Sequence, residues 1–271
     1  MRYIWDQYES YFGKGQAGLL TRTIMTWLRH PLQKWDVASS DGVHFFVANS
    51  QHVAKRIQKY YRRQAQVVYP PVDFHAFSFS SHDEGFYLMV TAFAPYKRVD
   101  LAIQACNRLG RSLKIVGAGQ DERRLLRMAG PTIEMLGWQS DQRIRECYAR
   151  CKALIFPGEE DFGIVPLEVM ASGKPVIAYA KGGALETVVP LNPSRERKMP
   201  SDQGAPTGIF FYEQTVEALI EAILLFERDG DSFDAELIRC HVSSFDRTQF
   251  KERMRELINR CYKEFHVNRS C

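Results

Sequence analysis

The sequence lacks several features that would place a protein in a class at once. It has no apolar run of the roughly 18 residues that a membrane-spanning helix needs, and no stretch patterned like a secretory signal peptide. Its six cysteines show no metal-ligand spacing. These absences predict a protein of the reducing cytoplasm without a metal site.

A concentrated basic charge is absent too. The 36 Lys and Arg residues nearly balance 32 Asp and Glu residues, for a net charge of +4. Proteins that bind nucleic acid gather basic residues into stripes, so nucleic acid is not expected as a partner. There is no internal repeat and no low-complexity tract. A chain of 271 residues with 45% hydrophobic residues is long enough for one large domain or two small ones.

From residue 86 onward, short apolar runs alternate with helical patterns. This alternation predicts an α/β fold with a doubly wound parallel sheet. The expected strands are Phe86–Ala92, Leu113–Val116, Thr132–Leu136, Ala153–Phe156, Pro175–Tyr179 and Gly208–Tyr212. The expected helices are Val99–Leu109, Asp121–Met128, Asp141–Cys151, one opened by Pro166, Thr215–Glu227 and Asp246–Phe265. The polar segment Asn192–Thr207 is predicted to be a loop.

The first 75 residues have a different pattern. They contain one strand, Phe45–Asn49, then a basic helix, Val53–Tyr61, and a short run, Gln66–Tyr69, that ends in two prolines. So few strands cannot form a sheet with a buried core. We therefore expect residues 1–75 to be an incomplete domain, residues 76–245 to form the main domain, and residues 246–271 to be a C-terminal helix.

Two glutamates separated by seven residues, Glu160 and Glu168, flank a Phe-Gly turn and the proline that opens a helix. They follow a buried strand, and side chains at the carboxyl end of a parallel strand face the crevice where α/β folds bind ligands. Carboxylates there suit the hydroxyl groups of a ribose or a sugar. The alternative is a surface acid and a helix-start acid without a ligand.

Three further segments at strand ends favour an anionic ligand. Lys97 and Arg98 stand before a helix N-terminus, where orphan N–H groups and the helix dipole attract phosphate. Gly117 and Gly182–Gly183 allow backbone to approach a ligand closely. Each of these has a simpler interpretation, a solvated lysine or a plain turn, but together on one edge they suggest a diphosphate.

The segment 14–34 has apolar residues at helical spacing: Leu20, Ile24, Trp27, Leu28 and Leu32. Basic residues surround them. A basic amphipathic helix can lie on an anionic membrane surface, which would place the protein at the inner face of the cell membrane. The other interpretation, which we favour, is a helix that packs on a further domain.

These segments carry a resemblance. Glu160–Glu168 resembles the Glu-x7-Glu motif of retaining glycosyltransferases of family 4, which have the GT-B fold. The similarity covers about Val43 to Phe250 and is closest to bacterial mannosyltransferases of polysaccharide synthesis. Other matching segments are Thr91–Asp100, Ile115–Gly119, Leu136–Trp138, Lys181–Val188 and Thr207-Gly208. Residues 76–245 would thus be the Rossmann-like donor domain of a GT-B enzyme, and residues 1–75 a partial N-terminal acceptor domain.

The resemblance implies roles for single residues. Lys97 would hold the diphosphate of the donor, Glu160 the hydroxyls of the transferred sugar, and Glu168 the ribose. Gly182 and Gly183 would present backbone N–H groups. The family needs no metal or cofactor, because cationic groups and a helix N-terminus stabilise the leaving diphosphate. Further substrate-binding positions would be Gly117, Leu136, Gly163, Ile164 and Val165.

Two departures from the family leave the activity open. The arginine that accompanies the family's lysine is replaced by Ala92. In addition, Met1–Asp6 resembles a segment well inside the N-terminal domain of the family. Three hypotheses follow. The chain is a transferase using GDP-mannose on a glycan or lipid-linked acceptor, either alone or with a separately encoded N-terminal half; a module that binds the donor only; or an inactive remnant.

Overall fold

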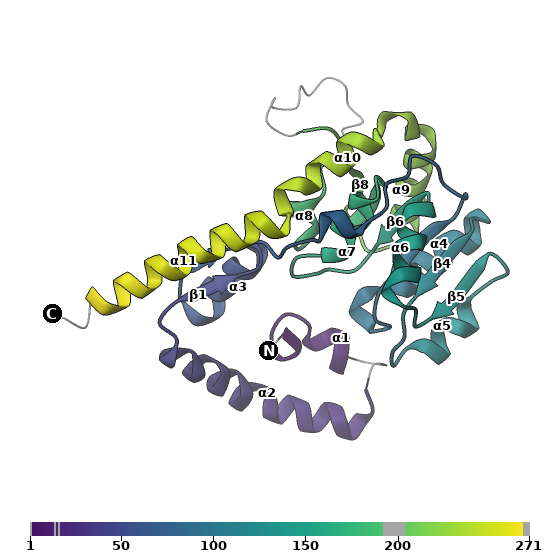
Figure 1. Cartoon of the computed structure of the whole chain (residues 1–271). Coiled ribbons are helices and arrows are strands. Elements are labelled where there is room, and N and C mark those ends of the chain that lie inside the picture. The colour runs from purple at the N-terminus through teal and green to yellow at the C-terminus, as the bar shows by residue number, and fades with distance from the viewer. Residues whose placement is uncertain (1, 14, 16, 192–203, 268–271) are drawn as a thin grey trace. The chain divides into compact units, whose positions relative to one another are not determined.

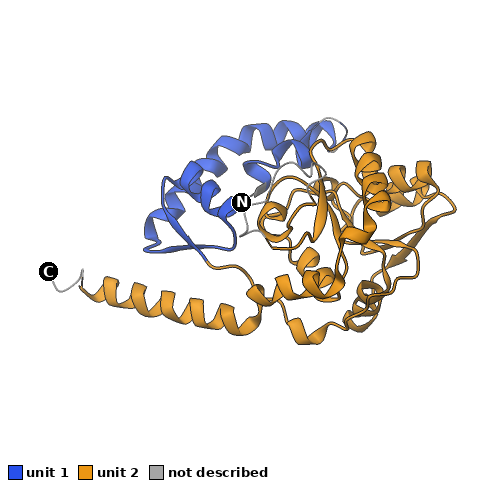
Figure 2. Cartoon of the chain, turned by 90° about the horizontal axis from the view of Figure 1, so that it is seen from above, with its two compact units in different colours: residues 1–67 blue, residues 68–271 orange. Residues whose placement is uncertain are grey.

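The structure is a computed structural model that describes residues 2–13, 15, 17–191 and 204–267. It divides into two compact units, Met1–Val67 and Val68–Cys271, coloured separately in Figure 2. The predicted linker Val68–Asp73 belongs to the second unit, where Val72 enters the core and its N–H donates to the Phe245 carbonyl at 2.9 Å. Most of the predicted loop Asn192–Thr207 lies outside the described residues.

A six-stranded parallel sheet forms the centre of the second unit (Figure 1). Its strand order is β5-β4-β3-β6-β7-β8, and every neighbouring pair is parallel. The predicted α/β, doubly wound, Rossmann-like fold is therefore confirmed. The strands are β3 (Tyr87–Val90), β4 (Leu113–Val116), β5 (Ile133–Gly137), β6 (Ala153–Phe156), β7 (Val176–Tyr179) and β8 (Gly208–Phe211).

Two hydrophobic cores cover the two faces of this sheet. Side chains alternate along a strand, so Tyr87 and Met89 of β3 enter one core while Leu88 enters the other. Helices α4, α5 and α9 contribute to the first core, and α6, α7 and α10 to the second. The helices are α4 (Val99–Leu109), α5 (Glu122–Met128), α6 (Asp141–Arg150), α7 (Ile164–Ala171), α8 (Ala184–Thr187), α9 (Val216–Arg228), α10 (Ala235–Val242) and α11 (Arg247–Val267).

The strand order sets the position of a ligand crevice. From β3 the chain moves outward through β4 to β5, whereas from β6 it moves the other way through β7 to β8. The neighbours β3 and β6 therefore form the topological switch point, where the loops that follow the two strands diverge. Those loops are residues 91–98 and 157–163.

Most predicted elements of the second unit are present. Strands β4 and β6 have the predicted bounds, β5 is shifted by one residue, β7 and β8 are one residue shorter than expected, and β3 is three residues shorter. Strand β3 ends at Val90, although the N–H groups of Thr91 and Phe93 still donate to the Val116 and Ala118 carbonyls at 3.0 and 2.9 Å. Helix α10 was not predicted. It begins at Ala235 and is capped by Asp234, whose carboxylate accepts hydrogen bonds from the N–H groups of Glu236 and Leu237.

The first unit has few strands, as the sequence predicted. Strands β1 (Phe46–Ala48) and β2 (Ala65–Val67) form a two-stranded parallel sheet joined by α3 (Gln51–Tyr61). Helix α3 begins two residues before the predicted start because Ser50 caps it, accepting the Val53 N–H at 3.0 Å. The unit also contains α1 (Tyr8–Phe12) and the long α2 (Leu19–Ser39).

An ion-pair cluster anchors the end of the sheet opposite the switch-point loops. Arg111 binds the Glu227 carboxylate through two hydrogen bonds of 2.8 Å, and the Tyr87 hydroxyl donates to it at 3.0 Å. These hydrogen bonds, from Arg111 above all, lower the pKa of Glu227 to about 2.

Replacing Glu227 by Gln is expected to lower the free energy of unfolding at pH 7 by about 2 kcal/mol. Because the folded pKa lies below the unfolded one, this contribution is present above about pH 4.5 and is lost as the pH falls toward 2. Urea unfolding at pH 7 and pH 3 measures the difference, which should shrink at pH 3. Glu221→Gln, an exposed position on the same helix, should change neither value.

Among the described helices, none combines the length and the apolar character required to cross a membrane.

Candidate functional site

Lys97 and Glu160 meet at the topological switch point. Lys97 ends a short 3-10 helix after β3, and Glu160 lies in the loop after β6. Their side chains form an ion pair and are only 18% and 14% exposed. Gly158 lets the two loops approach, because a Cβ there would lie 3.0 Å from the Lys97 Cα. The structure thus joins the two residues predicted to act on the donor.

The glycine pair after β7 packs directly against the Glu160 loop. Gly182 forms an isolated bridge with Glu160 and has a φ of 74°, and the Gly183 N–H donates to the Glu160 carbonyl at 2.9 Å. A Cβ on Gly183 would lie 2.2 Å from the Phe162 Cα. Both glycines therefore fix the backbone that carries Glu160, a role the sequence did not assign to them.

Gly117 serves a similar contact between the loops after β3, β4 and β5. Its φ is 146°, and a Cβ would lie 1.8 Å from the Thr91 carbonyl oxygen. Its N–H donates to the Gly137 carbonyl at 2.9 Å, which places Gly117 beside the residue that follows Leu136. Gly117, in the loop after β4, and Leu136, near the end of β5, were predicted separately as substrate-binding positions and thus lie close together at the carboxyl end of the sheet.

Glu168 lies on α7, and a buried tyrosine holds its carboxylate. The Tyr148 hydroxyl of α6 donates to Glu168 Oε2 at 2.9 Å. Burial raises the pKa of Glu168 above its usual value, and the hydrogen bond from Tyr148 opposes this rise. Within the described residues, Glu168 forms no ion pair with a cation. A carboxylate that accepts one hydrogen bond on one oxygen can accept further hydrogen bonds on the other.

The N-terminus of α7 lies between the two glutamates. Gly163 precedes the helix with a φ of 86°, a left-handed conformation that glycine adopts without strain. Ile164 and Val165 belong to the first turn, whose N–H groups have no acceptor within the helix. Gly163, Ile164 and Val165 thus place backbone N–H groups within five residues of Glu160 in the sequence, and their role in substrate binding stays a prediction.

Two neighbours of Lys97 bear on phosphate binding. The Arg98 guanidinium binds the Asp100 carboxylate at 3.2 and 3.3 Å and the Gln214 carbonyl at 3.4 Å. Arg98, considered from sequence as a phosphate ligand, is therefore engaged by α4 and the loop before α9. Ala92, the position at which the resemblance implies an arginine, is exposed and carries no charge.

Sequence reasoning missed Tyr148 and Gln214. Tyr148 lies on a predicted helix and reads as a core aromatic. Gln214 Nε2 donates to the Pro157 carbonyl at 2.8 Å and so supports the loop that carries Glu160. A buried carboxylate needs a hydrogen-bond donor, so the sequence could indicate that Glu168 has a partner. It could not indicate which residue that partner is.

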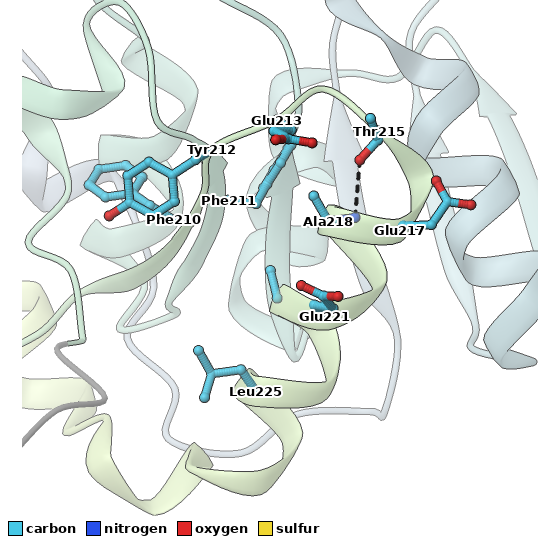
Figure 3. Close-up of a pocket in the computed structure, with 10 residues that line it drawn as sticks. Phe210, Phe211, Tyr212, Glu213, Thr215, Glu217, Ala218, Glu221 and Leu225 are labelled. Carbon is cyan, nitrogen blue, oxygen red and sulfur yellow. Dashed lines mark hydrogen bonds between the residues drawn. The ribbon is translucent and has the colours of Figure 1, made fainter.

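A pocket of about 440 Å³ lies elsewhere, between β8 and α9 at the edge of the sheet (Figure 3). Three carboxylates line it, from Glu213, Glu217 and Glu221, together with aromatic residues of β8. Figure 3 shows Thr215 capping α9 beside it, accepting the Ala218 N–H at 3.2 Å. None of the residues predicted from sequence to bind substrate lines this pocket.

No group of three or more His, Cys, Asp or Glu side chains in the described part of the chain is placed to hold a metal ion. The expectation that no metal or cofactor takes part stays a prediction.

Comparison with known families gives one match over most of the chain. The model described as "Glycosyl transferases group 1" matches residues 73–239, which include every candidate site residue discussed above.

Curated relatives agree with this match. An uncharacterized glycosyltransferase of Methanocaldococcus jannaschii is 29% identical over 161 residues, covering 58% of this chain and 45% of that protein. The alpha-1,3/1,6-mannosyltransferase ALG2 of Saccharomyces cerevisiae is 27% identical over 213 residues, covering 58% and 42%. A GDP-mannose-dependent alpha-mannosyltransferase of Mycobacterium tuberculosis is 36% identical over 102 residues, covering 37% and 27%. The aligned region thus spans less than half the length of these relatives.

Solved structures share the fold at low identity. Sucrose-phosphate synthase of Thermosynechococcus elongatus superimposes with a TM-score of 0.74 at 20% identity, over 87% of this chain and 62% of that one. HepE of Anabaena, in complex with UDP and glucose, gives a TM-score of 0.71 at 19% identity, over 84% and 66%.

Proposed function

Since the chain belongs to the group 1 glycosyl transferases, we propose that it binds a nucleotide-diphosphate sugar at the carboxyl edge of its sheet. It transfers a hexose, mannose by preference, to a glycan or lipid-linked acceptor with retention of configuration. One observation carries the proposal: the ion pair of Lys97 and Glu160 at the switch point of a doubly wound sheet.

The groups at this edge of the sheet bind different parts of the donor. Lys97 binds the diphosphate and stabilises the charge that develops as the sugar leaves, helped by the first-turn N–H groups of α7. Glu160 accepts hydrogen bonds from the sugar hydroxyls, and Glu168 accepts them from the ribose. Neither glutamate is assigned a proton transfer. Attack and departure on the same face of the sugar would give retention without an enzymic nucleophile.

The choice of mannose rests on the relatives. Two of the matched proteins described above are named as mannosyltransferases, one of them as GDP-mannose-dependent. HepE, at 19% identity, was solved with UDP and glucose, so the fold itself accommodates more than one base. GDP-mannose is therefore the first donor to test, with UDP-glucose and ADP-glucose beside it.

A second candidate function is donor binding without transfer. Exposed Ala92 removes one cation from the expected diphosphate site. The aligned region also covers only 45% of the Methanocaldococcus jannaschii relative and 42% of the Saccharomyces cerevisiae relative, so both relatives contain further chain. Under this alternative the chain binds a nucleotide sugar and turns it over only with an added N-terminal half. A transfer assay with and without the corresponding half of a relative separates the two functions.

Calorimetry with GDP-mannose tests the donor site through Glu168→Gln. We expect the variant to bind about 10- to 100-fold more weakly, because a charged acceptor for the ribose is lost. At neutral pH it should also melt at a higher temperature than the wild type. The pKa of Glu168 is raised by burial, so its ionised form costs stability once the pH exceeds that value, and a neutral amide avoids this cost.

Weaker binding with a higher Tm separates a functional carboxylate from a structural one. Glu221→Gln, exposed on α9, is the matched control and should bind like the wild type. Absence of binding to any of the three nucleotide sugars by the wild-type chain would overturn both candidate functions.

A further inference from the structure

Tyr148 is a buried hydrogen-bond donor beside the candidate site. Its side chain is 2% exposed, and its ring packs against Phe77 in the core, with the ring centroids 6.1 Å apart. Burial above all, and then the charge of Glu168, raise the pKa of Tyr148 well above its usual value, so the hydroxyl keeps its proton. The hydroxyl donates to Glu168 Oε2 at 2.9 Å. A packed aromatic side chain of α6 therefore holds one oxygen of a carboxylate on α7.

The side chain of Glu168 leans toward the end of α7 where a ligand is expected. Every Cα–Cβ bond of a helix tilts toward the N-terminus, so Glu168 shares a face with Ile164, four residues earlier. Ile164 opens α7, and its N–H has no acceptor within the helix. Helices α6 and α7 contact each other on one face of the sheet (Figure 1). A group bound at the N-terminus of α7 therefore lies on the side toward which Glu168 leans.

A carboxylate is an unfavourable partner for a buried hydroxyl. Burial raises the pKa of Glu168, so its ionised form destabilises the folded chain. A backbone carbonyl or a neutral amide would accept the hydrogen bond of Tyr148 without this loss. In the part of the chain that the structure describes, Glu168 Oε1 accepts no hydrogen bond. An ionised carboxylate has about four acceptor sites, so Tyr148 leaves most of them unused.

We propose that Tyr148 is a positioning residue, which fixes Glu168 so that its remaining acceptor sites receive both hydroxyls of a ribose. The site thereby distinguishes ribonucleotide sugars from deoxyribonucleotide sugars. This inference rests on the proposed function, in which Glu168 binds the ribose of the donor. The hydrogen bond to Oε2 restricts the rotation of the carboxylate, so that two neighbouring hydroxyls find their acceptors already oriented. A 2′-deoxyribose leaves one acceptor without a hydrogen-bond donor at a half-buried position, which weakens binding.

Tyr148 also acts on the charge of Glu168. Burial raises the pKa of Glu168, and the hydrogen bond from Tyr148 opposes this rise because it favours the ionised form. Within the described residues, the other charged groups that act on Glu168 are Asp141, which raises its pKa, and Arg145, which lowers it. Both lie on α6 and are exposed. Removing the Tyr148 hydroxyl should therefore raise the pKa of Glu168 and confine tight binding to higher pH.

Calorimetry at pH 6 and pH 8 tests the inference through Tyr148→Phe, which removes the hydroxyl and keeps the ring. The ligands are the nucleotide sugar that the wild type binds most tightly, among GDP-mannose, UDP-glucose and ADP-glucose, and its 2′-deoxy analogue. The wild type should prefer the ribose form about 30-fold, and the variant less than about 5-fold. Binding of the ribose form to the variant should weaken roughly threefold at pH 8 and roughly 30-fold at pH 6, because protonated Glu168 lacks the charge.

Tyr87→Phe is the matched control. The Tyr87 hydroxyl donates to Glu227 at 3.0 Å, so the substitution removes a second buried Tyr–Glu hydrogen bond, at the opposite end of the sheet. It should lower stability and keep the wild-type preference and pH dependence. In a chain that already carries Glu168→Gln, adding Tyr148→Phe should change neither quantity, because Tyr148 acts through the carboxylate.

Failure of this inference and failure of the proposed function give different results. A wild type that binds none of the three nucleotide sugars overturns the proposed function, and the inference with it. A wild type that binds one of them but accepts the 2′-deoxy analogue equally well overturns the inference alone. The same holds if Tyr148→Phe keeps the preference and pH dependence of the wild type, or if Tyr87→Phe changes both as Tyr148→Phe does.

Discussion

Replacing Gly183 by alanine is expected to weaken the binding of a nucleotide sugar about 100-fold and to cost about 2 kcal/mol of stability. The new Cβ would lie 2.2 Å from the Phe162 Cα and 2.3 Å from its carbonyl oxygen, and both are backbone atoms. No rotation of a side chain relieves such a contact. The loop after β7 must therefore move away from the loop that carries Glu160.

The movement reaches the donor site through one hydrogen bond. The Gly183 N–H donates to the Glu160 carbonyl at 2.9 Å, so separating the loops shifts Glu160 and with it the ion pair to Lys97. A displacement of about 1 Å in a positioning group is enough for the expected loss of affinity. Calorimetry with GDP-mannose and urea unfolding measure the two effects.

Gly230→Ala provides the matched control. A Cβ at Gly230 meets nothing within 4 Å, and the residue lies in the same unit. It should keep both affinity and stability. Normal donor binding by Gly183→Ala, in a protein that is as stable as the wild type, would show that the contact between the two loops does not position the site.

The sequence predicted those residues of the candidate site that directly follow a strand. Lys97 and Glu160 each follow a buried apolar strand, and the carboxyl ends of parallel strands share one edge of a sheet. That β3 and β6 are neighbours, and that the two side chains therefore pair, follows from the strand order, which local patterns do not encode. The resemblance to a family supplied the roles of these residues but not the contact.

Residues that support the site from a distance in sequence were not predictable. Tyr148 reaches Glu168 from another helix, and Glu227 reaches Tyr87 across 140 residues. Each looks like an ordinary helical residue, because nothing within its own segment marks the partner. Helical spacing likewise identified an apolar stripe in residues 20–32 but not its direction. The polar contacts of Arg29 and Asp36 turn that stripe outward.

Lys97→Met is expected to weaken donor binding by about 10- to 100-fold, the effect of losing one charged hydrogen-bond donor to the diphosphate. The loss should be large here because Ala92 offers no second cation and Arg98 is bound to Asp100. The same substitution leaves the Glu160 carboxylate, 14% exposed, without the cation that it contacts in the structure. An unpaired carboxylate at that depth destabilises the folded state.

The double variant Lys97→Met/Glu160→Gln separates the two consequences. Removing both charges should restore stability by roughly 1 kcal/mol or more relative to Lys97→Met, since the coupling of contacting residues is of order 0.5–3 kcal/mol. Donor binding should stay weak, because the cation for the diphosphate and the carboxylate for the sugar are both gone. Lys97→Arg keeps the charge and should retain most of the stability. If the double variant regained affinity together with stability, Lys97 would serve only to neutralise Glu160, and the diphosphate would have to be held by the backbone N–H groups of α7.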